Sequence, residues 1–301
     1  MRVLPPLEIT DARLTSSTVT EPDTGEAAWV AATSYALDAV VIRTTTHKKY
    51  QSIIAGVDAG LPENTPLRWL EIGPTNKYAM FDLLRNSQTV APSPLTVVLT
   101  PGKRINALAL VGLEAQSATI TMRVGATVVY TVTKNLNSRQ TATWTQYFFG
   151  EFRTQKNIAL FDLPLFSGAA ITVTLTSTTG TVKCGGCVVG TSVFIGEVEH
   201  DAESDALNFS KIDRTVSGTA ILQPRRSVPK TQQTLFLDKA LVNQVRDVRE
   251  SLNAVPAIWS GLDDPDDGYF DALLILGIYK QFTINLAYPS AAKISLLLEE
   301  I

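Results

Sequence analysis

The feature that most constrains the fold is a repeated alternation of apolar and polar side chains in the middle of the chain. Apolar residues occupy every second position in four runs, at residues 95–99, 120–124, 128–132 and 171–176. Successive side chains of a β-strand point to opposite faces, so each run predicts a strand with one buried face. Several such strands at short spacing predict an antiparallel β-sandwich.

Two short segments beside these runs predict hairpin turns. Gly125 and Ala126 lie between the second and third runs, where a two-residue turn is expected. The Ser-Thr-Thr-Gly sequence of residues 177–180 follows the fourth run. We expect a second hairpin to close there.

The last third of the chain mixes two patterns. Asp238 can cap a helix, because the apolar residues that follow it recur at helical spacing; they are Leu241, Val245, Val248 and Leu252. Residues 282–288 and 294–298 then alternate again, on either side of a Pro-Ser-Ala-Ala turn. These patterns predict one clear helix and a β-hairpin at the end of the chain.

Composition and residue pattern divide the chain into three parts. A polar lead of about 24 residues precedes a segment, residues 27–82, in which aromatic residues alternate with short apolar pieces. We therefore predict a mainly β protein. Its expected parts are a lead and small N-terminal β module (residues 1–82), a central antiparallel β-sandwich (83–195), and a C-terminal α+β region (196–301).

Charge and hydropathy argue against several classes of protein. A formal net charge of −3 and 18% charged residues leave no basic field for a phosphate backbone, so no nucleic-acid partner is expected. The longest apolar run, residues 272–279, is far shorter than the roughly 20 residues of a membrane helix. Pro5, Pro6 and Glu8 prevent the first residues from forming the apolar core of a signal peptide, so we expect no removable secretion signal there.

Two cysteines and two histidines are the first candidates for reactive or metal-binding groups. Cys184 and Cys187 are compatible with buried inert thiols, a turn-spanning disulfide or half of a metal site, although zinc needs four ligands and no second pair exists. The two cysteines do not form a disulfide framework, which favours synthesis in a reducing compartment. His47 and His200 lie in no recognisable motif, so we predict that both are surface residues.

The acidic residues before Gly268 are a further metal candidate. They resemble a calcium loop, but Pro265 occupies a ligand position and Leu274 stands where the closing glutamate belongs. A solvated acidic turn is the favoured interpretation. No glycine-rich phosphate loop follows a strand. We therefore predict no catalytic residue, no cofactor and no metal site.

Aromatic residues gather near residues 68–82, where Trp69, Tyr78 and Phe81 lie among turn-forming residues. Either a small module closes here or a planar ligand is bound here. With the upstream aromatics, the order Trp29, Tyr35, Tyr50 and Trp69 resembles the chitin-binding type of carbohydrate-binding module. The turn glycine of that family is absent at residues 38–39. The resemblance implies that these four rings either stack on sugars or fill the module core.

A wider resemblance covers most of the chain. Residues 50–56 and 69–82, a Thr-rich region containing residues 144–149, and residues 188–190 together resemble tail-associated structural proteins of bacteriophages. In those proteins a carbohydrate-module-like domain precedes a β-sandwich and a small α+β end. Residues 76–82 are then expected to form the junction that docks the module on the sandwich.

These resemblances predict a non-enzymatic virion protein of a phage tail, baseplate or fibre attachment region. It would be made in the bacterial cytoplasm, and its partners would be other tail proteins and copies of itself. A tail protein that binds a host glycan or receptor through exposed rings is the alternative. A polysaccharide-degrading enzyme is a third hypothesis, which would release reducing sugars from host glycans.

Overall fold

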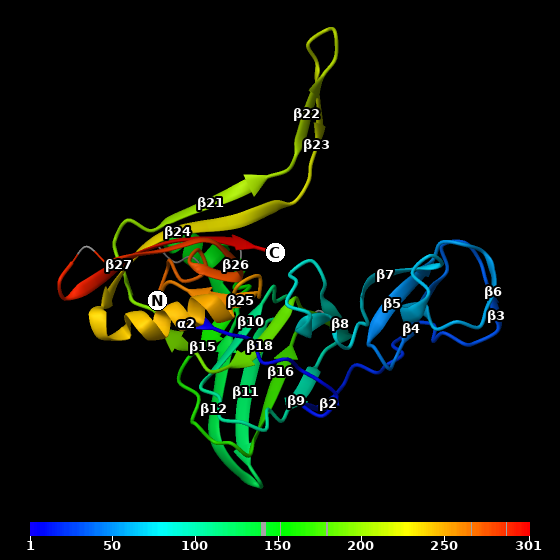
Figure 1. Cartoon of the computed structure of the whole chain (residues 1–301), viewed down its shortest axis with the longest axis horizontal. Helices are drawn as coiled ribbons and strands as arrows, with labels where there is room; N and C mark the ends of the chain where they lie inside the picture. Colours follow the sequence, from blue (N-terminus) through cyan, green and yellow to red (C-terminus); the bar gives the residue numbers. More distant parts are fainter. Residues whose placement is uncertain (140–142, 151, 179, 266, 287) are drawn as a thin grey trace.

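The computed structural model describes residues 1–301 except 140–142, 151, 179, 266 and 287 (Figure 1). The fold is mainly β and its strands pair antiparallel, as predicted. No helix in the described part of the chain is long and apolar enough to cross a membrane.

The central sheet contains the strands that the alternating pattern predicted. Its order is β12-β11-β16-β9-β2, and its members are β2 (Leu14–Ser17), β9 (Leu95–Leu99), β11 (Ser117–Val124), β12 (Thr127–Asn135) and β16 (Ala169–Thr176). In β16 every second residue is buried, because one face of the strand covers the core and the other faces solvent.

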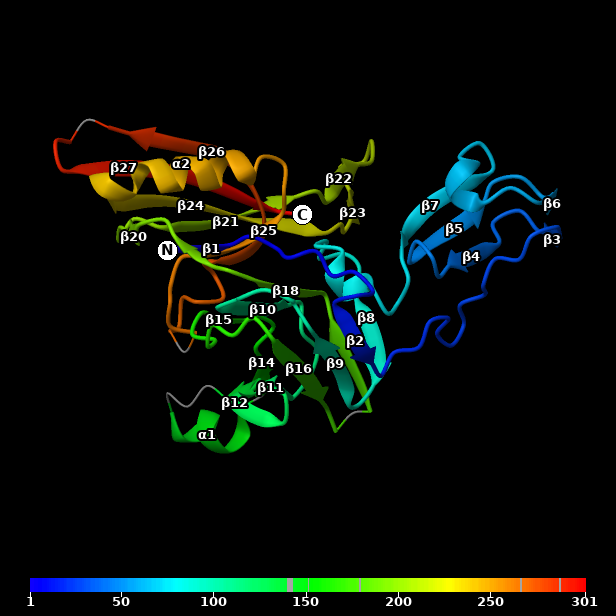
Figure 2. The same ribbon diagram turned by 60° about the horizontal axis from the view of Figure 1, so that its bottom comes forward.

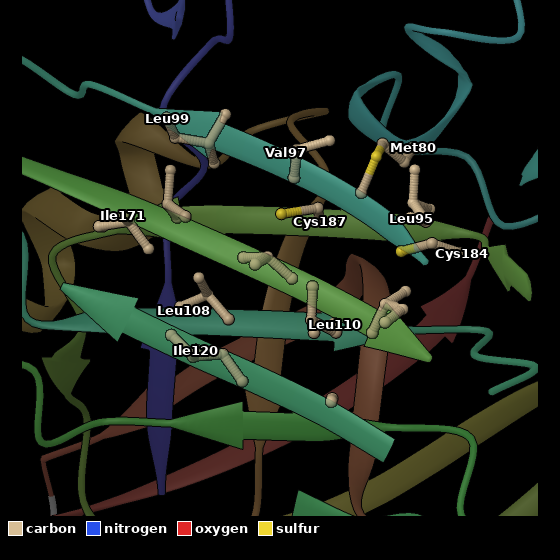
Figure 3. Packing of buried hydrophobic residues seen from close by; sticks show 14 of the residues in the cluster. Met80, Leu95, Val97, Leu99, Leu108, Leu110, Ile120, Ile171, Cys184 and Cys187 are labelled. Carbon is tan, nitrogen blue, oxygen red and sulfur yellow. The ribbon is translucent and has the colours of Figure 1, made fainter. Parts of the chain in front are cut away.

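A second, three-stranded sheet covers the buried face of the central sheet. It has the order β15-β10-β18 and contains β10 (Ala107–Val111), β15 (Ile158–Leu160) and β18 (Gly186–Gly190). Figure 3 shows Leu108 and Leu110 of β10 in the same core as Ile120 and Ile171 of the central sheet. The two sheets thus form the sandwich that the sequence predicted.

The two predicted turns have different outcomes. The hairpin at Gly125 is confirmed, because β11 and β12 pair directly across it and Gly125 has a positive φ of 59°. The prediction that a hairpin closes at residues 177–180 is wrong. Both edges of β16 are already paired, with β9 and β11, so β17 (Thr181–Cys184) pairs with β8 (Thr89–Pro92) in a separate small sheet.

A third sheet is built mainly from the end of the chain. Its path is β19-β1-β25-β26-β27-β24-β20, with β21 also paired to β24. Its strands are β1 (Arg2–Leu4), β19 (Val193–Phe194), β20 (Glu197–Val198), β21 (Glu203–Asn208), β24 (Ser227–Asp238), β25 (Ala257–Ser260), β26 (Leu274–Asn285) and β27 (Ala291–Glu300). The predicted terminal hairpin is confirmed as β26 and β27.

The predicted helix is also confirmed. Asp238 accepts a hydrogen bond from the Ala240 amide and starts the 3-10 turn η3 (Lys239–Leu241), which leads into α2 (Val242–Ser251). Val245 is fully buried with Trp259 in the core between the helix and the sheet. Figure 1 shows α2 lying along this sheet.

The three-stranded sheet lies in the middle of the molecule. Every residue of β10 and β18 is buried, because one face packs on the central sheet and the other packs on β1, β25 and β26. The start of the chain crosses these layers. Its strand β1 belongs to the C-terminal sheet and its strand β2 to the central sheet.

The N-terminal module projects from these layers (Figures 1 and 2). It contains β3 (Thr33–Tyr35), β4 (Val40–Arg43), β5 (Lys48–Ser52), β6 (Gly56–Asp58), η1 (Pro62–Asn64) and β7 (Trp69–Pro74), and η2 (Ala79–Phe81) follows it. The strands form a β4-β5-β7 sheet and a β3-β6 pair. The module therefore has its own small sheet.

Three short elements complete the chain. Residues 144–149, expected within a β region, form the helix α1 (Trp144–Phe149), whose cap is Thr143. The strands β13 (Asn137–Arg139) and β14 (Phe152–Thr154) pair on either side of it. The strands β22 (Lys211–Arg214) and β23 (Ala220–Gln223) form a separate hairpin.

Candidate functional site

The four aromatics predicted as glycan platform or module core come together in one cluster. Tyr50 on β5 is 3% exposed and Trp69 on β7 is 2% exposed. Trp29 and Tyr35 are half-buried and pack against them. The Tyr35 ring meets the Trp69 ring edge-on, with centroids 5.1 Å apart. Neither Tyr50 nor Trp69 offers a free ring face to a sugar.

The polar atoms of Trp69 and Tyr35 are also hydrogen-bonded inside the module. The Trp69 indole donates to the Asp58 carboxylate at 3.1 Å, and the Tyr35 hydroxyl donates to the Val30 carbonyl at 3.1 Å. The Arg43 guanidinium lies 5.0 Å from the centroid of the Trp29 ring and covers it. The geometry is that of a compact aromatic core.

Aliphatic side chains cover the outside of the same module. They include Leu67, which is 86% exposed, and Leu70 on β7, which directly follows the buried Trp69. The full set of large exposed apolar residues is Val30, Leu37, Val40, Ile53, Ile54, Val57, Leu61, Leu67, Leu70 and Ile72. Ten large exposed apolar side chains on so small a module make its surface a candidate contact site.

The junction predicted at residues 76–82 docks the module on the central sheets. Tyr78 and Met80 are buried in the same core as Leu95 and Val97, and Figure 3 shows Met80 beside these two residues. The prediction is confirmed for this part of the stretch. Phe81 is partly buried against the same core.

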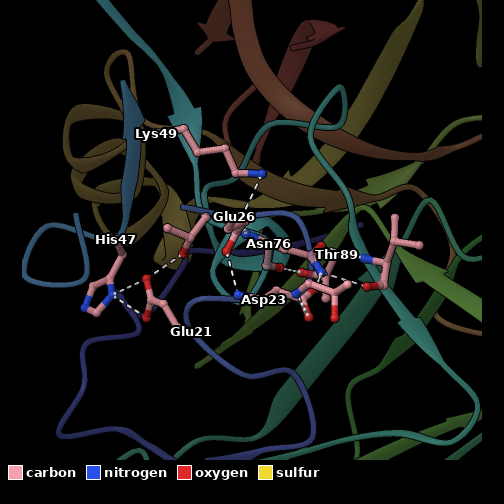
Figure 4. A network of polar contacts seen from close by, with 10 residues as sticks. Glu21, Asp23, Glu26, His47, Lys49, Asn76 and Thr89 are labelled. Atoms are coloured by element: carbon pink, nitrogen blue, oxygen red, sulfur yellow. Dashed lines mark hydrogen bonds and ion pairs between the residues drawn. The ribbon is translucent and has the colours of Figure 1, made fainter. Parts of the chain in front are cut away.

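Asn76 fixes the junction through its side chain. Its amide oxygen accepts from the Val90 amide at 2.9 Å, and its amide nitrogen donates to the Val90 carbonyl at 2.7 Å. These two hydrogen bonds have the same donor and acceptor on Val90 as the bonds that a neighbouring strand would make with β8. The Thr89 hydroxyl donates to the Asn76 carbonyl at 2.7 Å (Figure 4).

A second polar cluster at the junction contains His47. Its ring stacks on the Tyr78 ring with centroids 3.8 Å apart. The His47 Nδ1 lies 2.9 Å from a Glu21 carboxylate oxygen, and its Nε2 lies 3.2 Å from an Asp11 carboxylate oxygen. His47 was predicted to be a surface residue; the structure shows it half-buried, with two carboxylates and an aromatic ring around it. His200 is exposed, as predicted.

Two pKa values in this cluster are shifted. The Tyr78 hydroxyl donates to Asp11, and this bond is the main cause of the lowered pKa of Asp11. Burial, followed by the contact with Asp11, raises the pKa of Tyr78. The Thr75 hydroxyl donates to Glu21 at 2.8 Å (Figure 4 shows Glu21 and His47). Each acid in the cluster thus already has a donor from the protein.

A cavity of about 620 Å³ lies beside this cluster. His47, Tyr78 and Asp11 line it together with Glu71 and Asp82. Burial raises the pKa of the Asp82 carboxyl, while the Ser87 hydroxyl donates to it. The cavity lies between the module and the lead segment, and Asp11 of the lead connects the two through its contacts with His47 and Tyr78.

The two cysteines and the acidic residues before Gly268 were the other candidates for reactive or metal-binding groups. Cys184 and Cys187 are buried free thiols without a disulfide between them, and burial raises the pKa of Cys184 to about 12. Asp263 is exposed and pairs with Arg2 at 3.0 Å. The described residues contain no group of three or more histidine, cysteine or acidic side chains that could hold a metal ion.

The chain was compared with protein families, curated proteins and solved structures. No protein-family model matches the chain, and no curated protein matches it. The structure is similar to chitosan-binding module 1 from a chitosanase/glucanase of Paenibacillus sp. IK-5. The identity is 13%, the match covers 38% of this chain and 82% of that one, and the TM-score is 0.26.

Proposed function

We propose that this protein is a non-enzymatic structural component of a bacteriophage virion, in the tail, baseplate or fibre attachment region, and that it works by protein–protein assembly. The observation that carries the proposal is the aliphatic surface of the N-terminal module. A small projecting module that buries its rings and exposes its aliphatic side chains suits a protein partner, since apolar burial drives most protein association.

The phage assignment is supported by the sequence resemblance of residues 50–56 and 69–82 to tail-associated proteins. The partners proposed are other tail proteins and further copies of the chain. Synthesis in the bacterial cytoplasm is part of the same proposal. It agrees with the presence of only two cysteines in the chain, which is too few for a disulfide framework.

Glycan binding by the same module is the weaker candidate. It needs rings whose faces are open to a sugar, whereas Tyr50 and Trp69 are buried and Arg43 covers the Trp29 ring. Polysaccharide cleavage is weaker still, because two of the acids beside the cavity at His47 are engaged in hydrogen bonds: Asp11 with His47 and Tyr78, and Asp82 with Ser87.

Mass spectrometry of purified virions tests the proposed function. Particles of a phage that encodes this chain are separated on a density gradient, and their proteins are identified against the unfractionated lysate as control. We expect the polypeptide to be enriched with the particles at a constant ratio to known tail proteins. A chain that stays in the lysate and is absent from intact particles would refute the proposal.

A further inference from the structure

The β22–β23 hairpin projects from the C-terminal sheet without any cover. We call residues 209–226 the arm; Figure 1 shows it extending away from the end of β21 and the start of β24. Residues 211–227 are all exposed except Asp213, which is half-buried. An isolated two-stranded hairpin is marginally stable in water, so a partner surface would stabilise the arm.

The arm exposes apolar side chains that its own fold cannot bury. Ile212 and Leu222 are cross-strand partners, so they lie side by side on one face, and they are 63% and 68% exposed. Phe209, Val216 and Ile221 are also exposed. The arm thus presents apolar anchors along most of its length.

The arm and the rest of the chain have opposite charge. Four of the 26 basic residues and one of the 29 acidic residues lie in the arm, which leaves 22 basic and 28 acidic residues elsewhere. The arm therefore carries a formal charge of +3, while the remainder carries −6. This complementarity favours another copy of this chain as the partner, because the body of each copy attracts the arm of the next.

A surface of matching chemistry lies at the opposite end of β21. We call it the acidic groove; it has a volume of about 670 Å³ and apolar lining from Val198, Leu262, Ala272 and Leu273. Tyr269, which is 74% exposed, also lines it. The groove lies at an acidic segment without Lys or Arg, which contains Glu197, Glu199, Asp201, Glu203 and Asp205.

The acidic side chains that line the groove are Glu199 and Asp267, and His200 lies beside them. Lys293 pairs with Glu199 at 2.8 Å and neutralises one carboxylate. Asp267 also lines the groove and is exposed. Arg214 of an arm would meet Asp267 at the groove, while Ile212 and Leu222 would cover the apolar lining.

The arm and the acidic groove lie too far apart to meet within one chain. Ser204, at the start of β21, lines the groove, and the arm begins after Asn208, where β21 ends. Six strand residues span roughly 20 Å, and Figure 1 shows the arm continuing away from that end. A contact between them therefore joins two copies head to tail, which closes into a ring where the rotation permits.

We propose that the arm of one copy binds in the acidic groove of the next copy. The inference rests on the proposed assembly function and gives it a specific contact. Two double variants separate its halves: Ile212→Asp with Leu222→Asp removes the arm anchors, and Tyr269→Arg with Ala272→Arg makes the groove repel the arm. All four side chains are exposed, so both variants should fold.

Light scattering coupled to gel filtration measures the mass of each protein, and thermal unfolding verifies that each is folded. At protein concentrations up to on the order of 100 µM, wild type should form assemblies that are multiples of 32.6 kDa. Each double variant should be a monomer. An equimolar mixture should give a dimer, because it restores one intact arm and one intact groove. Val128→Asp, at an exposed site of β12, is the matched control and should assemble as wild type does.

Two results would overturn the arm contact. They are a wild-type protein that stays monomeric and a mixture of the two variants that gives no dimer, and a third result has the same consequence. A groove variant that still assembles would show that arms bind elsewhere, which also refutes the proposal. If the arm contact fails these tests but the chain is found in virions, the proposed function stands. If the two variants form a dimer but the chain is absent from virions, only the proposed function is refuted.

Discussion

At the scale of single residues, the bond between Tyr78 and Asp11 makes the module junction sensitive to pH. The Tyr78 hydroxyl is the main cause of the lowered pKa of Asp11. A carboxyl whose pKa is lowered on folding stabilises the fold above its unfolded pKa, and this stabilisation is lost as the pH falls through the folded pKa. The Asp11 side chain is 73% exposed, so solvent screening reduces the effect.

We predict that Tyr78→Phe lowers the free energy of unfolding by about 1 kcal/mol at neutral pH. The cost should be smaller at an acidic pH below about 3.9, the ordinary pKa of an aspartate, because the charged acceptor is lost as the pH falls through the lowered pKa of Asp11. Urea unfolding of both proteins at the two pH values measures the difference. An equal cost at both values would show that the hydroxyl acts through packing alone.

The residues of this junction also show what one sequence can reveal. Tyr78 is noticeable because aromatics and turn residues are dense around it, and its role in docking was predicted. The enclosure of His47 was missed, because its carboxylate partners lie 26 and 36 positions earlier in the chain. The spacing of neighbouring residues in the sequence gives no signal of a contact between residues so far apart.

At the scale of elements, the β4-β5-β7 sheet depends on a very small core. Its buried apolar residues are Val41, Tyr50 and Trp69, with Trp29 and Tyr35 packed against them. Truncation of a buried tryptophan to alanine typically costs about 3–5 kcal/mol. A three-stranded sheet with so few buried side chains is expected to lose its structure when Trp69 is removed.

We therefore predict that Trp69→Ala unfolds the module while the central sheet persists. Hydrogen exchange should become fast in β4, β5 and β7 and stay slow in β11 and β16. Leu70→Ala is the matched control at the next, exposed position of β7, with an expected change within about 0.5 kcal/mol. If Trp69→Ala keeps full protection but loses binding to a host polysaccharide, the glycan hypothesis is favoured instead.

The predictability of each strand depends on how many of its faces are buried. Alternation identified β9, β11 and β16 because only one face of each is buried, and it identified β12, in which Tyr130 and Val132 are partly buried against the same core. It missed β10 and β18, because a strand covered on both faces is apolar throughout and has no period of two. The pairing of β17 with β8 was missed as well, since it joins segments some 90 residues apart.

At the scale of the whole molecule, one buried carboxylate joins three distant parts of the chain. Glu300 is at the end of β27 with its side chain 3% exposed. It accepts from Arg85, in the segment that follows the module junction, and from Arg226, at the base of the arm. The Arg85 amide also donates to the Ile301 carbonyl at 3.3 Å. The end of the chain thus holds the module connection and the arm base together.

We predict that Arg85→Met lowers the free energy of unfolding by about 2–3 kcal/mol, because it leaves the buried Glu300 charge with Arg226 alone. Adding Glu300→Gln to Arg85→Met should recover part of this loss, since the neutral amide costs less to bury. Urea unfolding of the two single variants and the double variant gives the coupling between the residues. Lys48→Met is the matched control, because both partners of the Lys48–Glu71 pair are about half exposed and such pairs contribute about 0–1 kcal/mol. Additive effects of Arg85→Met and Glu300→Gln would mean that the carboxylate does not hold these parts together, and that the connection of module, arm and C-terminal sheet depends on apolar packing instead.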